Sequence, residues 1–430
     1  MALPSVGGPL VWAFVTFASV LHLLEQYLEV RQLRKNRETQ IPHELEGTVD
    51  TEHFQQSQAY QSDKRQFGVI RSWINFAWDK VGLFMLTPLA WQMAVSVCGA
   101  QAEYYSTLLW LLLMHWFDKP LNIPLSLYSI FVVEERHGFN KMTLKLYFMD
   151  MLKSELLTYV FGGLFVPLII WIVRTYGAHC HLYLWGTCQF LMMAMMWIYP
   201  NVIQPLFNKF QPVEDQELRA DIEALAAEVK FPLTKLFQID GSTRSSHSNA
   251  YFFGFWKYKR IVLYDTLLHL KREDILAIIC HELGHWKFSH TLTNLCIASA
   301  HLFVLFWMFG KVMYSGEVSK SMIRQFGFGD TEAVMVSLML FMLLVSPVEQ
   351  FLNLAMTILS RKFEFQADAF AAQMGRAAPL RSGLHQIHQE NKGELNPDEW
   401  YSWYHFSHPP LVERLRALKA LESAGEKKAD

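Results

Sequence analysis

Long apolar segments recur along this 430-residue chain and restrict its fold more than any other feature. A helix that crosses a lipid bilayer needs about 20 mostly apolar residues. Segments near that length lie at residues 10–28, 81–100, 104–117 with a continuation to 133, 156–173, 182–203, 292–314 and 333–359. They predict a predominantly α-helical, polytopic membrane protein with about seven transmembrane helices. The third segment is the least regular, because Asp118, Lys119 and Pro120 interrupt it.

Basic residues are concentrated on one side of the predicted spans. Lys and Arg are frequent after the first, third and fifth spans and nearly absent after the second and fourth. Loops that stay in the cytosol are enriched in Lys and Arg, so the N-terminus is predicted to face the lumen or exterior and the C-terminus the cytosol. The net charge of −2, with 18% charged residues, indicates no surface for nucleic acid.

The run 281–285 reads His-Glu-Leu-Gly-His and lies in an apolar, helix-like stretch. Residues four apart share one face of an α-helix, so His281 and His285 can bind one Zn²⁺. Glu282 follows beside the open coordination position, where a carboxylate can accept a proton from water. The alternative is a surface helix with two solvated histidines, and the apolar neighbours argue against it. The motif therefore predicts a zinc hydrolase site on the cytosolic side of the membrane.

A third zinc ligand must come from elsewhere, because zinc hydrolases use three protein ligands and keep one position open. Glu364 is the predicted ligand, and Asp368 lies one helical turn further on the same face. There Asp368 is suited to accept the free N–H of a zinc-bound histidine, which fixes the ring's orientation. The alternative is an acidic pair on a solvated helix. The surrounding aromatic and alanine residues favour a buried functional face.

The polar stretch before the zinc motif has a helix pattern at residues 214–230 and a short strand pattern at 236–239. Two further strand patterns, at 250–255 and 260–264, predict a β-hairpin. An edge strand can hold an extended peptide by main-chain hydrogen bonds and so lay its scissile bond over a metal. Asn249, at the start of the hairpin, is a candidate donor to substrate backbone; the alternative is a turn-forming Asn.

Two residues near the C-terminus are further candidates for the site. His408 precedes two prolines and can donate to the oxyanion of a tetrahedral intermediate. Arg414 can do the same or can instead anchor one of the carboxylates. The alternatives, a loop histidine and a solvated arginine, stay open on pattern alone.

Four short runs match one known family, in the family's order: Ser248-Asn249-Ala250-Tyr251-Phe252, His281-Glu282-Leu283-Gly284-His285-Trp286, Phe363-Glu364-Phe365-Gln366-Ala367-Asp368-Ala369-Phe370 and Ser407-His408-Pro409-Pro410. The chain resembles the integral-membrane CAAX prenyl protease of the Ste24 type, a zinc metallopeptidase of family M48. The resemblance covers nearly the whole chain. It implies a seven-helix barrel around a large intramembrane chamber, capped by a cytosolic-side, gluzincin-like metalloprotease domain with a small sheet.

The resemblance also implies a role for each candidate residue. It implies one Zn²⁺ held by His281, His285 and Glu364, with Glu282 as general base. Asp368 is then expected to support one of the zinc ligands, and His408 and Arg414 are expected to lie near the reacting carbonyl. Substrate backbone is expected to bind to Asn249, Ala250 and Tyr251. The implied activity is removal of the last three residues from prenylated CaaX proteins, in some members with a second, upstream cut. The alternative is a quality-control zinc protease of the endoplasmic-reticulum membrane that cuts unlipidated or translocation-stalled proteins. A seven-span receptor or inactive scaffold is the alternative from a different class.

The predicted organisation alternates membrane and catalytic parts. Residues 1–207 hold the first five spans, and residues 208–290 hold the first part of the metalloprotease domain. Residues 291–360 hold the last two spans, and residues 361–430 hold the third ligand and a cytosolic tail. The predicted partners are a prenylated substrate and membrane lipid, and a monomer is compatible with the sequence.

The predicted location is the endoplasmic-reticulum membrane, with the inner nuclear membrane as a further candidate. Lys427 and Lys428 near the end of the chain have the form of a dilysine retrieval signal, which acts only on a cytosolic tail. The alternative is a charged, frayed terminus.

Overall fold

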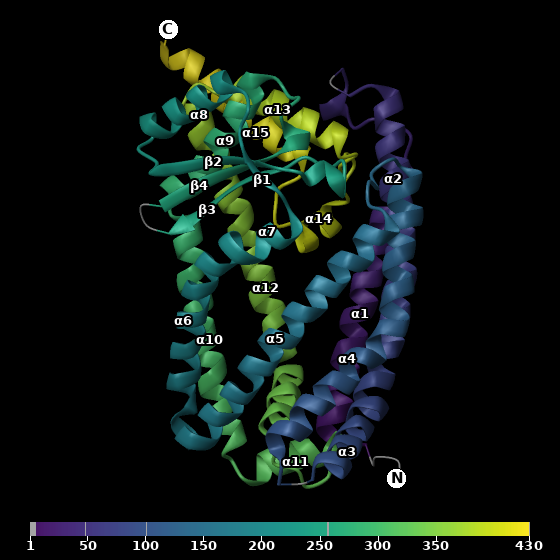
Figure 1. Cartoon of the computed structure of the whole chain (residues 1–430). Helices are drawn as coiled ribbons and strands as arrows, with labels where there is room; N and C mark the ends of the chain where they lie inside the picture. Colours follow the sequence, from purple (N-terminus) through teal and green to yellow (C-terminus); the bar gives the residue numbers. More distant parts are fainter. Residues whose placement is uncertain (1–5, 48, 100, 256–257, 430) are drawn as a thin grey trace.

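The computed structural model describes residues 6–47, 49–99, 101–255 and 258–429, without the side chains of Glu44, Phe255 and residues 424–429. Lys427 and Lys428 therefore lie outside the described side chains. Long helices form one part of the molecule, and a small sheet with shorter helices covers one end of them (Figure 1). This arrangement agrees with the predicted helical membrane protein with a small β-containing catalytic part.

Several of the long helices follow one another with only a short π-helical or 3₁₀ segment between them. Helix α2 (Thr51–Val81) continues into α3 (Thr87–Cys98) through the π-helical η2 (Gly82–Leu86). Only a 3₁₀ turn, η4 (Gly177–His179), separates α5 (Leu144–Tyr176) from α6 (Cys180–Ile198). The π-helical η3 (Ser129–Glu134) extends α4 (Glu103–Tyr128), and η5 (Tyr199–Ile203) joins α6 to α7 (Gln204–Phe207). The helices are α1 (Pro9–Lys35), α2 (Thr51–Val81), α3 (Thr87–Cys98), α4 (Glu103–Tyr128), α5 (Leu144–Tyr176), α6 (Cys180–Ile198), α10 (His290–Met313), α11 (Glu317–Gln325) and α12 (Val334–Gln373).

In the described part of the chain, five helical stretches are long and apolar enough to cross a membrane: Pro9–Lys35, Thr51–Cys98, Leu144–Phe207, His290–Met313 and Val334–Gln373. The predicted number of about seven spans is therefore not confirmed. One of the five stretches contains both α5 and α6, which were predicted as separate spans, and α4 is not among them. Asp118 and Lys119 lie inside α4 and lower its apolar character.

These helices expose large apolar side chains. Phe190 on α6 is 70% exposed and Phe351 on α12 is 74% exposed. In water such surfaces would be unfavourable, whereas in a bilayer they face hydrocarbon. The chain is therefore a multi-pass membrane protein whose long helices expose large apolar side chains.

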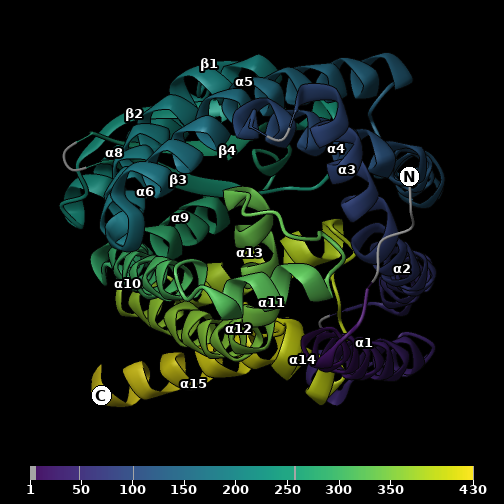
Figure 2. The ribbon, with the colours of Figure 1, turned by 90° about the horizontal axis from the view of Figure 1, so that it is seen from below.

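Viewed along their axes, the long helices form a ring (Figure 2). One buried apolar cluster joins α1, α3, α4, α11 and α12, and a second joins α5, α6, α10 and α12. Helix α12 contributes to both clusters and so connects the two sides of the ring. The ring agrees with the predicted barrel; the chamber inside it stays a prediction.

A four-stranded sheet lies at one end of the ring, in the order β1-β2-β4-β3. The strands are β1 (Phe210–Pro212), β2 (Leu233–Ile239), β3 (Ala250–Phe255) and β4 (Tyr258–Tyr264). Strands β3 and β4 form the predicted antiparallel hairpin. The sequence did not indicate β1, nor the parallel pairing of β2 with β4, which joins segments far apart in the chain.

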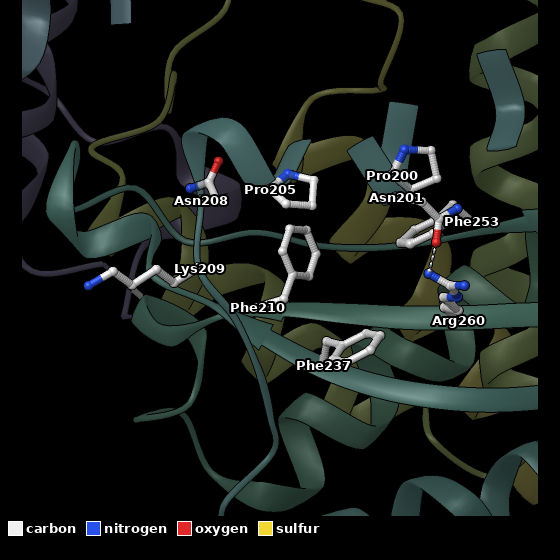
Figure 3. Close-up of a pocket in the computed structure, with 9 residues that line it drawn as sticks. All are labelled: Pro200, Asn201, Pro205, Asn208, Lys209, Phe210, Phe237, Phe253 and Arg260. Atoms are coloured by element: carbon white, nitrogen blue, oxygen red, sulfur yellow. Dashed lines mark hydrogen bonds between the residues drawn. The ribbon is translucent and has the colours of Figure 1, made fainter. Parts of the chain in front are cut away.

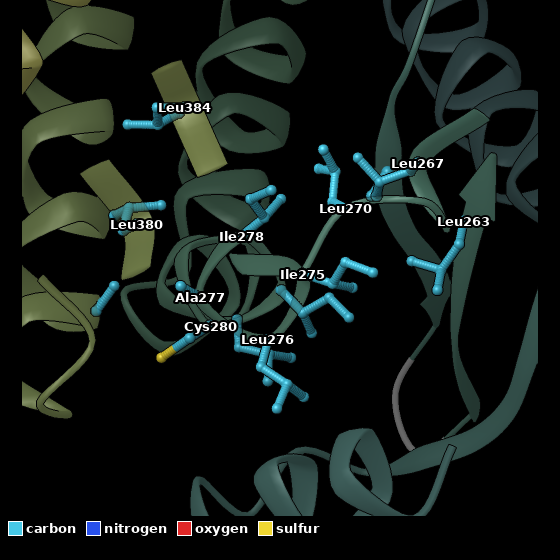
Figure 4. Close-up of a cluster of buried hydrophobic side chains, with 14 of the residues drawn as sticks. Leu263, Leu267, Leu270, Ile275, Leu276, Ala277, Ile278, Cys280, Leu380 and Leu384 are labelled. Carbon is cyan, nitrogen blue, oxygen red and sulfur yellow. The ribbon is translucent and has the colours of Figure 1, made fainter. Parts of the chain in front are cut away.

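The main apolar core packs between this sheet and helix α9 (Arg272–Lys287). Figure 4 shows α9 contributing Ile275, Ala277 and Ile278 to that core. The surrounding helices are α8 (Gln216–Glu228), α13 (Ala377–Glu390), α14 (Glu399–His405) and α15 (Leu411–Ala429). Asp215 caps α8 by accepting hydrogen bonds from the N–H groups of Glu217 and Leu218. The metal-motif helix is thus held on several sides by buried side chains.

Candidate metal centre

Helix α9 carries the two histidines and the glutamate of the motif, and α12 packs directly against it. Glu273 and Asp274 lie in the first turn of α9, where acidic side chains stabilise the helix dipole. The helix is buried along most of its length, so its polar residues point into a defined site. Glu364 lies on α12 and is also buried.

Three potential ligand side chains from the two helices converge on one point. The Nε2 atoms of His281 and His285 lie 3.2 Å apart. Glu364 Oε2 lies 3.4 Å from His281 Nε2, and Glu364 Oε1 lies 3.3 Å from His285 Nε2. Zinc–nitrogen and zinc–oxygen bonds near 2.1 Å place neighbouring tetrahedral ligands about 3.4 Å apart. The donor set and its spacing therefore fit a tetrahedral metal ion with one position left open.

Glu364 supplies a second observation in favour of a cation. Its Oε2 atom is buried and accepts no hydrogen bond in the described structure, although His408 Nδ1, His281 Nε2 and Arg414 Nη1 lie 3.0, 3.4 and 3.6 Å away. A buried carboxylate oxygen without a donor is costly. A metal ion between the three side chains removes that cost.

Asp368 fixes one of the histidine rings. Its Oδ1 atom lies 2.9 Å from His281 Nδ1, which leaves Nε2 of that ring for the metal. Arg414 in turn holds Asp368 through two hydrogen bonds, Nη2 to Oδ1 at 2.7 Å and Nε to Oδ2 at 2.9 Å. All three side chains are buried. The structure thus places Arg414 on a carboxylate, which is one of the two positions open to it from the sequence.

His285 has a comparable partner that the sequence analysis missed. His290, just after the motif helix, lies with its Nδ1 atom 3.0 Å from His285 Nδ1. Its Nε2 atom lies 2.9 Å from Gln366 Oε1, and its ring stacks on Phe363 at 4.0 Å. Gln366 and Phe363 flank Glu364 on α12. The only available sequence signal was a histidine five residues beyond the motif, which by itself indicates nothing specific.

His408 lies in the loop between α14 and α15, and its side chain is 67% exposed. Asp398 caps the start of α14, the helix that leads into this loop, by accepting hydrogen bonds from the N–H groups of Trp400 and Tyr401 at 3.1 Å. Asp398 also pairs with Arg31 of α1 at 2.9 Å. The helix that leads into the His408 loop is therefore tied to α1.

The three predicted substrate-contact residues lie at the start of β3, which packs against α9. Asn249 is exposed, and its side-chain oxygen accepts a hydrogen bond from Ala250 N–H at 2.8 Å. Ala250 is buried in the core. The Tyr251 hydroxyl contacts the side chain of Gln204 on α7. The main chain of β3, rather than these three side chains, is therefore what can contact a substrate near the metal centre.

The electrostatics of the centre favour positive charge. Burial opposes the charged form of His281, but the carboxylates of Asp368 and Glu364 outweigh it and raise the pKa of His281 to about 9. Burial raises the pKa of the neighbouring Glu282, while the two histidines act in the opposite direction. A metal ion would replace the proton that these carboxylates attract.

Comparisons with known proteins cover nearly the whole chain. Residues 30–209 match a family described as CAAX prenyl protease N-terminal, five membrane helices, and residues 212–422 match peptidase family M48. A CAAX prenyl protease 1 homolog from Arabidopsis thaliana is 43% identical over 418 residues, covering 95% of this chain and 97% of its own length. The human homolog is 35% identical over 459 residues, covering 95% of both chains.

The structural comparison agrees. A crystal structure of Ste24p from S. mikatae superimposes with a TM-score of 0.87 at 36% sequence identity. The match covers 97% of this chain and 100% of that one.

Proposed function

This chain belongs to peptidase family M48, and from that premise we propose that it is a membrane zinc endopeptidase that removes the last three residues from prenylated CaaX proteins. The observation that carries the proposal is the convergence of His281, His285 and Glu364 at tetrahedral spacing, beside Glu282 and next to membrane-spanning helices. Relatives of nearly equal length bear the name CAAX prenyl protease 1.

In the proposed mechanism, His281, His285 and Glu364 hold Zn²⁺, which when bound supplies Lewis acidity to polarise the scissile carbonyl. Glu282 takes a proton from the attacking water and passes it to the leaving amine. Asp368 keeps His281 oriented. No covalent intermediate with the enzyme forms in this scheme.

His408 and Arg414 differ in the role that their geometry supports. The mostly exposed His408 has an edge free for a substrate oxyanion. Two of the Arg414 nitrogens are committed to Asp368, which supports an anchoring role. For Asn249, Ala250 and Tyr251 we propose main-chain hydrogen bonds to an extended peptide, because β3 is an edge strand of the sheet.

The position of the metal centre next to the membrane-spanning helices supports a substrate that carries a lipid. A prenyl chain partitions into the bilayer, so a site close to the membrane surface meets the lipidated tail without extracting it. We propose the cytosolic face of the endoplasmic-reticulum membrane, with the inner nuclear membrane as a further location, on the basis of the Lys and Arg distribution. The division into 1–207, 208–290, 291–360 and 361–430 belongs to the same proposal, and the family matches divide the chain near its first boundary.

Cleavage of a farnesylated CaaX peptide by the purified protein, with mass-spectrometric mapping of the cut, tests the function. We expect release of the last three residues, and little cleavage of the same peptide without its lipid. Equal cleavage of both peptides would favour the quality-control alternative. A second, upstream cut in a longer lipidated substrate would appear in the same experiment.

Metal analysis tests the cofactor separately. We expect about one zinc per chain, and its loss in His285→Ala. A protein that cleaves the peptide at full rate without any bound metal would contradict the zinc assignment.

A further inference from the structure

A pocket lies between the sheet and the segment that runs from η5 through α7 to β1 (Figure 3). Its volume is about 420 Å³. This volume suits a small ligand or a lipid headgroup. The cavity, here called the interfacial pocket, is lined by Asn201, Lys209, Phe210, Phe237, Phe253 and Arg260, together with Pro200, Pro205 and Asn208.

The strand pairing explains why the two faces of the sheet differ. Phe253 of β3 lies directly opposite Arg260 of β4, so both side chains point to the same face. Their sequence neighbours Phe252 and Ile261 point the other way and pack in the core beside α9. The interfacial pocket therefore has its own aromatic and basic face and shares none of the metal-centre residues.

The charge of the pocket is unbalanced. Arg260 donates a hydrogen bond to Asn201 Oδ1 at 2.9 Å, and its guanidinium carbon lies 5.6 Å from the Phe253 ring centre. Among the described residues, no carboxylate pairs with Arg260 or with the Lys209 side chain. The nearby Asp240 accepts a hydrogen bond from the backbone N–H of Lys209. A half-buried guanidinium without a carboxylate partner indicates that the pocket accepts an anion.

The same segment ends the stretch Leu144–Phe207, which is long and apolar enough to cross a membrane. Trp197 and Tyr199 on this stretch are 65% and 53% exposed. Exposed Trp and Tyr side chains collect at the headgroup level of bilayers. The pocket therefore sits where phospholipid headgroups are present at high local concentration.

We propose that the interfacial pocket binds the headgroup of an anionic phospholipid. The phosphate pairs with the guanidinium of Arg260, and the glycerol and upper acyl chains lie on the ring faces of Phe210, Phe237 and Phe253, while the exposed Lys209 adds positive charge at the opposite edge of the pocket (Figure 3). Anionic lipids are abundant in cytosolic leaflets, which agrees with the proposed orientation of the chain. This lipid site goes beyond the proteolytic function and does not depend on it.

Native mass spectrometry of the purified protein in detergent tests the site, with phosphatidylserine or phosphatidylcholine titrated as the probe. We expect one phosphatidylserine to bind in preference to phosphatidylcholine. In Lys209→Gln/Arg260→Gln we expect its affinity to fall roughly tenfold or more, because each basic residue contributes about a fivefold factor. Arg260→Lys keeps the charge and should keep most of the preference for phosphatidylserine.

The matched control is Arg219→Gln/Lys419→Gln, which removes the same charge from α8 and α15. It should bind phosphatidylserine like the wild type, and an unchanged melting temperature in both double variants shows that they are folded. Equal loss in both double variants, or no preference for phosphatidylserine, would overturn the proposal. So would binding of inorganic phosphate or glycerophosphoserine as tight as that of the lipid, because the pocket would then be a site for free anions.

Discussion

Gly284 on α9 lies so close to Ala367 on α12 that a Cβ atom at Gly284 would stand 3.0 Å from the Ala367 Cα. The two helices contribute the metal ligands, His281 and His285 from one and Glu364 from the other. The absence of a side chain at Gly284 therefore sets the distance between the ligand sets. The glycine inside the motif is a packing requirement of the site.

Gly284→Ala should consequently weaken the metal centre. The added methyl group forces α9 and α12 apart, at a cost of about 1–3 kcal/mol in stability. We expect a lower melting temperature and a lower zinc affinity, measured by thermal unfolding and by competition with a chelator. Gly310→Ala on α10 is the control, because its Cβ meets only ordinary contacts at 3.6 Å. Unchanged zinc affinity in Gly284→Ala would contradict this explanation.

Glu282→Gln should remove activity and leave the metal in place. The amide cannot accept the proton of the attacking water, so kcat should fall about 10²–10⁴-fold. The zinc content should stay at the wild-type level, because Glu282 is not among the converging ligands. Peptide cleavage and metal analysis on the same preparation measure both. Glu273→Gln, in the first turn of the same helix, should retain activity.

His290→Ala should lower zinc affinity although His290 is not a predicted ligand. Its contact with His285 helps to orient that ring, and loss of such a partner typically costs 10–100-fold in affinity. Chelator competition measures the effect. His269→Ala removes a mostly exposed histidine that pairs with Glu390, and it should leave affinity unchanged. If the two variants bind zinc equally, His290 has no orienting role.

Arg414→Ala should destabilise the fold. It leaves Asp368 buried without its guanidinium partner, which typically costs about 3–5 kcal/mol. Because the two groups act as a pair, Asp368→Asn/Arg414→Ala should be less destabilised than the sum of the single variants. Unfolding of all four proteins measures this coupling. Normal stability with a reduced kcat in Arg414→Ala would instead assign Arg414 to the oxyanion.

His388 on α13 should make the fold sensitive to mild acid. Burial lowers the pKa of His388 to about 4, and the positive charge of Arg414 acts in the same direction. As pH falls below about 6.5, the unfolded chain gains a proton that the folded protein excludes until about pH 4. The stability that the neutral ring contributes is thus present above pH 6.5 and is lost toward pH 4.

Thermal unfolding between pH 7 and pH 5 measures this dependence. In His388→Gln the melting temperature should fall less steeply over that range, because the amide does not titrate. Identical slopes in the two proteins would show that His388 does not govern the acid response.

The site could be predicted to the extent that it depends on local helix geometry. The four-residue spacing of His281 and His285, and of Glu364 and Asp368, sets which side chains share a face. The structure brings all four together. His290 could not be foreseen, because its contact with Gln366 joins residues 76 positions apart and follows no periodic pattern.

In the fold, too, local features could be predicted from the sequence, whereas pairings between separate segments could not. The hairpin β3–β4 is a local pairing and was predicted, whereas the parallel pairing of β2 with β4 depends on a crossover that the pattern does not specify. The number of membrane spans was also harder to predict than their existence. Asp118, Lys119 and two internal prolines in α4 do not interrupt the helix, although they change its composition.

The 40-residue helix α12 runs from the far end of the membrane ring to the metal centre without a break. From Val334 to Glu364 it spans roughly 45 Å at 1.5 Å per residue. A tilt of about 1° about its far end would therefore move Glu364 by roughly 0.8 Å, more than the ~0.5 Å tolerance of a catalytic constellation. The close packing of α12 against α9 at Gly284 and Ala367 therefore has to hold the end of this long helix in place beside the two histidines.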